Sequence, residues 1–195
     1  MSLTKIQEPP DRCLILLTGI PGAGKSTFCH QVVVKSIALD RPIIFVTSEQ
    51  SPADVIELLS ERGIREPVSL NFVDAFTETV GMTCTQRSDT VCANCADLNS
   101  LSIAITKLQE RTGSKGVLLI FDSLTSPYLF SGLEVMKFMR LFLSKFVSEG
   151  NSVLALMDEG CGKEEDLGAM MSVADGIIRM EMKESSRIIN VVKHP

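Results

Sequence analysis

The chain has 195 residues, of which 45% are hydrophobic and 22% are charged. This length and composition indicate one globular domain with a sizeable core, and they exclude a disordered or low-complexity chain. The formal net charge of -5 and the low aromatic content, 5% with no Trp, disfavour a surface for DNA, RNA or anionic membranes.

Short apolar runs alternate with helical stretches along the chain. The predicted strands are residues 13–19, 42–48, 68–76, 116–121 and 152–157, followed by a hairpin of residues 176–182 and 187–193 that turns at 184–186. The predicted helices are residues 25–39, 51–62, 98–111, 135–146 and 167–174. Residues 77–99 have weak periodicity and predict a long irregular excursion. The pattern indicates an α/β fold: a mostly parallel twisted sheet with helices on both faces and a C-terminal antiparallel hairpin, in a single domain spanning residues 1–195.

Two of the predicted helices have specific local signals. Ser51 is a typical N-cap, with Pro52 at the first helical position and Asp54 as the acidic partner three residues on. Gly63 is well placed to end that helix in a left-handed conformation. The helix across 135–146 has apolar residues at helical spacing that predict one core-facing side: Val135, Phe138, Met139, Phe142, Leu143 and Phe146.

The strongest functional signal is the sequence GIPGAGKST at residues 19–27. It matches the pattern G-x-x-x-x-G-K-[ST] between a predicted buried strand and a helix. Glycines let successive backbone N–H groups point at an anion, and the helix N-terminus adds partial positive charge. We therefore expect a phosphate-binding loop rather than a Gly-rich turn that binds nothing. The predicted nucleotide-binding residues are Gly22, Ala23, Gly24, Lys25, Ser26 and Thr27.

Within this loop, Lys25 is expected to reach the β- and γ-phosphates, Ser26 to ligate Mg²⁺, and Thr27 to lie near the α-phosphate. Asp122 ends a buried strand, at the position where a P-loop protein places a carboxylate for the metal. The alternative for Asp122 is a residue that only caps the turn after the strand. Ser26 and Asp122 are thus the predicted metal residues.

Glu49 follows the second predicted strand. A carboxylate there could orient and deprotonate an attacking water, or it could be a solvated loop residue beside the Ser51 cap. Spacing alone leaves both interpretations of Glu49 open.

Four segments, FVTSEQSPADVIELL, LNFVDAF, LLIFDSLT and VADGIIRM, together resemble the RecA-like ATPases of the KaiC and archaeal RadA group. The resemblance runs from about residue 13 to 193 and is strongest to small single-domain KaiC-like proteins. It implies a RecA-like fold that hydrolyses ATP between adjacent subunits, and therefore a homo-oligomer. It also implies that Glu49 is the catalytic glutamate and that Lys193 reaches a neighbour's γ-phosphate.

The chain departs from that family in two places. KaiC has paired glutamates where this chain has Glu49 and Gln50. Relatives often carry a hydroxyl or amide residue where the strand at 152–157 is followed by Asp158 and Glu159. Two carboxylates near a γ-phosphate are unfavourable, so slow hydrolysis is expected.

The loop at residues 158–166 also bears on nucleic acid binding, because recombinases use the loop after this strand to bind single-stranded DNA. Here it has five acidic residues against Lys163. Phosphate contacts require the opposite sign of charge, so a recombinase is disfavoured.

The cysteines give weaker signals. The six cysteines, in a chain with no signal-peptide pattern, do not indicate a disulfide framework. Cys84, Cys92 and Cys95 are expected to be buried or loop thiols, with a zinc or redox site as the alternative.

The predicted function is therefore an ATP-binding KaiC-like domain, a slow Mg²⁺-dependent ATPase. The alternative is a non-catalytic ATP-dependent regulatory or partner-binding switch. A small kinase is disfavoured because no Arg cluster suggests a phosphate-clamping lid, and a GTPase because there is no N-K-x-D sequence. With no membrane-length apolar run, the chain is expected to be cytoplasmic.

Overall fold

Eight strands of the computed structural model pair into one sheet. The structure describes residues 9–64, 69–113, 115–183 and 186–195. The strands are β1 (Leu14–Gly19), β2 (Ile43–Thr47), β3 (Leu70–Asp74), β4 (Thr90–Cys92), β5 (Leu118–Asp122), β6 (Ser152–Asp158), β7 (Gly176–Lys183) and β8 (Ser186–Lys193). Their order is β4-β3-β2-β5-β6-β1-β7-β8, with β7 and β8 antiparallel and the other pairs parallel. The predicted fold class is confirmed; the proposed turn residues 184 and 185 lie outside the described part of the chain.

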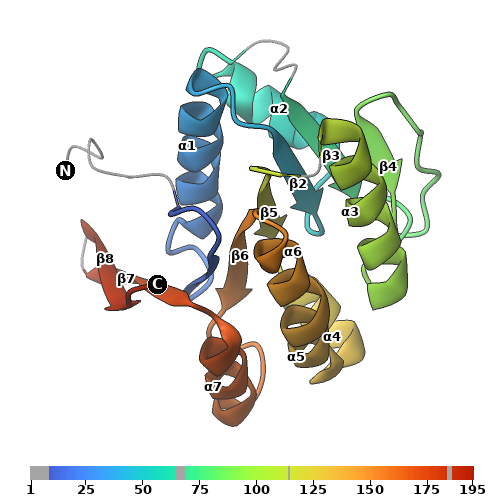
Figure 1. Cartoon of the computed structure of the whole chain (residues 1–195). Helices are drawn as coiled ribbons and strands as arrows, with labels where there is room; N and C mark the ends of the chain where they lie inside the picture. Colours follow the sequence, from blue (N-terminus) through green and yellow to red (C-terminus); the bar gives the residue numbers. More distant parts are fainter. Residues whose placement is uncertain (1–8, 65–68, 114, 184–185) are drawn as a thin grey trace.

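The helices cover both faces of this sheet (Figure 1). They are α1 (Lys25–Ala38), α2 (Pro52–Ser60), α3 (Leu98–Thr112), α4 (Thr125–Ser131), α5 (Glu134–Phe138), the π-helical segment η1 (Met139–Leu143), α6 (Ser144–Ser148) and α7 (Glu164–Val173). Side chains alternate along β1, β2, β3, β5 and β6 between two buried clusters. On β1, Leu16 packs into the cluster that contains α3 and α5, whereas Leu17 packs into the cluster that contains α1 and α2.

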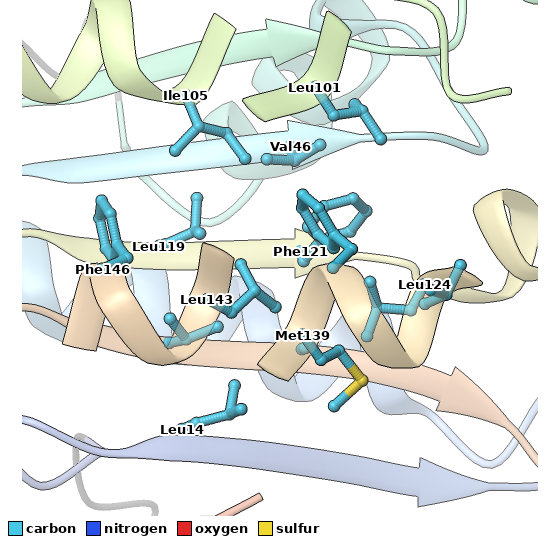
Figure 2. Packing of buried hydrophobic residues seen from close by; sticks show 14 of the residues in the cluster. Leu14, Val46, Leu101, Ile105, Leu119, Phe121, Leu124, Met139, Leu143 and Phe146 are labelled. Atoms are coloured by element: carbon cyan, nitrogen blue, oxygen red, sulfur yellow. The ribbon is translucent and has the colours of Figure 1, made fainter. Parts of the chain in front are cut away.

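The helical stripe predicted for residues 135–146 packs against the sheet as one continuous surface across α5, η1 and α6. All of its residues are buried except Phe142, which is half-buried and stacks on Phe138 with ring centroids 5.3 Å apart. Figure 2 shows Leu143 and Phe146 from this surface near Leu119 of β5. The helix α4 before it was not predicted, since its seven residues are too few for a periodic pattern.

The segment at residues 77–99, predicted to be irregular throughout, contains some regular structure. It contains β4, which pairs with β3 over only three positions, Phe72 to Asp74. A disulfide joins Cys84 to Cys92 with Cα atoms 6.1 Å apart, so the expectation of free thiols is wrong for these two residues. Cys95 is free and buried, as expected. The pairing depends on how the excursion folds back on β4, which spacing alone does not specify.

One buried histidine predicts how the fold responds to acid. His30 on α1 is 3% exposed, and burial together with the charge of Arg62 lowers its pKa from 6.5 to about 4. His30 is therefore protonated near pH 6.5 in the unfolded chain but only near pH 4 in the folded chain. The contribution of His30 to the free energy of unfolding should therefore fall by about 2 kcal/mol as pH drops through this window. Urea unfolding of the wild type and of His30→Gln at pH 7 and 4.5 isolates this contribution as the difference between the two proteins. An equal pH-dependent change in both proteins would contradict the role of His30.

Candidate nucleotide-binding site

The candidate residues gather at the carboxyl ends of the parallel strands. β5, β6 and β1 are adjacent in the sheet, and β2 lies beside β5. The start of α1, directly after the loop that follows β1, supplies Lys25 and Ser26, while the ends of β5 and β6 supply Asp122 and Asp158. In open α/β sheets, ligands bind at this edge. Residues far apart in the sequence thus converge on one place.

Two glycines on either side of the loop after β1 lie very close to atoms of the β7–β8 hairpin. Gly24 has φ +96°, and a Cβ at this position would lie 3.0 Å from Nε of Arg187. At Gly19 a Cβ would lie 2.4 Å from the carbonyl oxygen of Met180 on β7. Ala23 donates its N–H to the carbonyl of Ile20 at 3.1 Å, which closes the turn between them. Packing against the β7 backbone therefore requires a glycine at position 19, whereas at position 24 it is the positive φ that favours glycine.

The N-terminus of α1 is left open to an anion. Gly24 provides no side-chain cap, and the first turn, which contains Lys25, Ser26 and Thr27, has no acidic residue. The helix α2 is the contrast within the same chain. There, the predicted capping box is confirmed, because Ser51 accepts the N–H of Asp54 and Asp54 accepts the N–H of Ser51. Unpaired N–H groups and the helix dipole make the α1 terminus suitable for phosphate.

Lys25 lies over this loop and is 6% exposed. Its Nζ donates to the carbonyls of Gly19 and Ile20, each at 2.9 Å. It also pairs with Oδ1 of Asp158 at 2.6 Å. The ammonium is thus held at the loop by two fixed backbone oxygens and one charged side chain.

Ser26 and Asp122, the two predicted metal residues, are in contact with each other. The Ser26 hydroxyl donates to Oδ1 of Asp122 at 3.2 Å. Oδ2 of Asp122 is buried with no hydrogen-bond partner. Burial and the nearby Glu49 raise the pKa of Asp122 to about 7.

A cation would satisfy the unpartnered oxygen and offset the burial of this carboxylate. Mg²⁺ usually takes one or two protein oxygens and completes its shell with phosphate and water. The Ser26–Asp122 pair fits that ligand set. Among the described residues, no group of three or more His, Cys, Asp or Glu side chains forms an all-protein metal cage.

Glu49 lies two residues beyond the end of β2 and its side chain faces the same edge. Its Oε1 accepts the Ser123 hydroxyl at 2.6 Å. Ser123 is itself fixed, because its N–H donates to Oγ of Ser48 at 2.9 Å and its carbonyl accepts the Ser48 hydroxyl at 2.7 Å. The Ser48–Ser123 pair therefore orients the carboxylate of Glu49.

Lys193 does not join these residues within one chain. It pairs with Ile177 near the start of β7, whereas Gly19 at the loop end of β1 pairs with Met180. Its Nζ donates to the carbonyl of Ala174 at 2.5 Å. Lys193 thus lies towards the opposite edge of the sheet from its own phosphate-binding loop.

Two residues at the site were missed in the sequence. Arg187, at the start of β8, is exposed and its guanidinium lies against Gly24. Ser123 orients Glu49, as described above. The register of the β7–β8 hairpin places Arg187, and no local sequence signal reveals that register. Ser123 did have a local signal in the sequence, because it is a hydroxyl residue directly after the predicted metal residue Asp122.

A glycine-rich loop between a buried strand and an uncapped helix, with a carboxylate at the end of a nearby parallel strand, defines a P-loop nucleotide-binding domain. A family model described as "ATPase: KaiC" matches residues 6–194. The chain therefore belongs to the KaiC ATPase family, whose RecA-like fold it shares.

Relatives and solved structures agree with this assignment. UPF0273 proteins from Methanocaldococcus jannaschii and Aeropyrum pernix are each 28% identical to this chain. The first alignment covers 90% of this chain and 74% of the relative, and the second covers 90% and 72%. The crystal structure of a KaiC-like protein from Pyrococcus horikoshii OT3 shares the fold with a TM-score of 0.70 at 18% identity, covering 95% of this chain and 80% of that one. None of the helices in the described residues is long and apolar enough to cross a membrane.

Proposed function

We propose that this domain binds ATP with Mg²⁺ and hydrolyses it slowly. The observation that carries the proposal is the contact between Ser26 and Asp122, which leaves a buried carboxylate oxygen unpartnered beside the phosphate-binding loop. Membership of the KaiC ATPase family supports ATP as the nucleotide. The bound cation would neutralise charge on the phosphates.

Each residue of the site has a separate role in ATP binding or hydrolysis. The N–H groups at the start of α1 hold phosphate oxygens, and Lys25 adds a positive charge at the terminal phosphates. Ser26 and Asp122 hold Mg²⁺. Glu49 accepts a proton from the attacking water, and Ser123 fixes one of its oxygens while the other stays available. In an assembly, Lys193 of one subunit acts at the site of the next.

The position of Lys193 supports action between subunits rather than within one. Its pairing with Ile177 and its bond to the carbonyl of Ala174 hold it near the amino end of β7, away from its own loop. A homo-oligomer with nucleotide at the subunit interface is therefore part of the proposal. The function does not require nucleic acid.

Asp122→Asn tests the metal site. The amide keeps the shape and can still accept the Ser26 hydroxyl, but it loses the negative charge that favours Mg²⁺. Titration calorimetry should show that ATP affinity in the presence of Mg²⁺ falls by roughly tenfold or more, while affinity in EDTA changes little. Glu134→Gln, which removes an exposed carboxylate paired with Lys137, is the matched control and should change neither. An equal loss with and without Mg²⁺ would identify Asp122 as purely structural.

A second candidate function is a non-catalytic switch in which ATP binding, not hydrolysis, changes a partner surface. The ion pair between Lys25 and Asp158 favours it, because it places a carboxylate where the terminal phosphate is expected. Steady-state phosphate release separates the two functions: the switch binds ATP without turning it over.

A further inference from the structure

The Lys25 ammonium has no donor left for a phosphate. An ammonium carries three N–H donors. The carbonyls of Gly19 and Ile20 and the carboxylate of Asp158 take one each. Any phosphate that Lys25 is to hold must therefore replace one of these acceptors. The two carbonyls belong to the loop backbone, so Asp158 is the acceptor that a ligand can displace.

The backbone of Asp158 is fixed while its carboxylate has room to move. Asp158 pairs with Gly19 across β6 and β1, and its N–H donates to Oγ1 of Thr125 at 2.9 Å. Its side chain is 20% exposed. It also lines a pocket of about 320 Å³ between the end of β6 and α7. A rotation of the side chain into this space releases Lys25 without moving the strand.

We propose that Asp158 competes with the γ-phosphate for Lys25 and so makes the site discriminate against ATP in favour of ADP. This inference rests on the proposed nucleotide-binding function. The β-phosphate that both nucleotides share can be held by the N–H groups at the start of α1. The γ-phosphate depends more on Lys25, and it brings negative charge to a site where Asp122, Glu49 and Asp158 already converge.

The neighbouring Glu159 provides an internal control. Its carboxylate accepts from Nε of Arg179 at 2.8 Å rather than from Lys25. Asp158 at the end of β6 and Glu159 directly after it are thus successive carboxylates, each with a different cation. Removing the charge of Glu159 changes the local net charge by the same amount but leaves the Lys25 pair intact.

The experiment measures ADP and ATP affinities by titration calorimetry in excess Mg²⁺ for four proteins. These are the wild type, Asp158→Asn, Asp158→Ala and Glu159→Gln. The amide of Asp158→Asn can still accept from Lys25 but carries no charge, while Asp158→Ala removes the competitor. Both should tighten ATP binding relative to ADP by roughly tenfold, whereas Glu159→Gln should leave the ratio of the two affinities unchanged. Thermal unfolding of each variant checks that the fold is retained.

Two results would overturn the inference while nucleotide binding stands. One is an unchanged ATP-to-ADP ratio in both Asp158 variants. The other is weaker ATP binding in these variants, which would make the carboxylate a support for the metal or phosphate. If none of the four proteins binds either nucleotide, the proposed function fails and the inference with it. Binding by the wild type therefore separates the two failures.

Discussion

Lys25→Ala is expected to abolish detectable ATP binding, with a loss of at least about a hundredfold in affinity. The substitution removes the one buried lysine positioned over the phosphate-binding loop among the described residues. It also leaves the Asp158 carboxylate without its cation in the place expected for the terminal phosphate. The loss should therefore exceed that of a single neutral hydrogen bond.

Lys35→Ala is the matched control because Lys35 lies in the last turn of the same helix, away from the loop. It should bind ATP like the wild type. The double variant Lys25→Ala/Asp158→Asn separates lost attraction from added repulsion: it should recover part of the affinity that Lys25→Ala loses. Calorimetry measures all four proteins. ATP binding by Lys25→Ala at wild-type strength would remove this loop from consideration as the nucleotide site.

Features that depend on nearby residues could be predicted from the sequence. The strand, loop and helix around Lys25 are specified by an apolar run, glycines and helix-forming residues within one short segment. The capping box of Ser51 and Asp54 spans four residues and is formed as expected. Asp122 at the end of one predicted strand and Glu49 just after another were candidates from their positions alone, and the structure brings both to the edge of the sheet that carries the loop.

Features that depend on long-range register could not be predicted. The contact of Arg187 with Gly24 requires the alignment of β8 on β7 and of β7 on β1, which no local pattern specifies. The disulfide between Cys84 and Cys92 depends on the path of the excursion beside β4. The sequence did suggest that Asp158 and Glu159 lie near the γ-phosphate. The structure shows that the two carboxylates have different partners, since Asp158 contacts Lys25 while Glu159 contacts Arg179.

Glu49→Gln is expected to retain ATP binding and to lose hydrolysis by roughly a hundredfold or more, the contribution typical of a general base. Glutamine can still accept the Ser123 hydroxyl through its carbonyl oxygen, so the side chain keeps its position. It cannot take a proton from water. Phosphate release under steady-state conditions measures the loss, and calorimetry checks that ATP affinity is kept. Gln50→Ala, at the neighbouring position, is the control and should leave hydrolysis nearly unchanged.

Lys193 supplies the test of catalysis between subunits. If it acts on a neighbour's site, hydrolysis per chain should rise with protein concentration as sites assemble, and Lys193→Ala should flatten that rise while nucleotide binding persists. Mixing Glu49→Gln with Lys193→Ala should then recover activity, because an intact Glu49 in one chain can face an intact Lys193 from the other. Hydrolysis that depends on Glu49 but not on protein concentration would exclude only catalysis between subunits. Because Lys193 lies away from the loop of its own chain, its role would then be the structural contact with the carbonyl of Ala174. Wild-type turnover in both variants would instead remove the catalytic assignment and favour the non-catalytic switch.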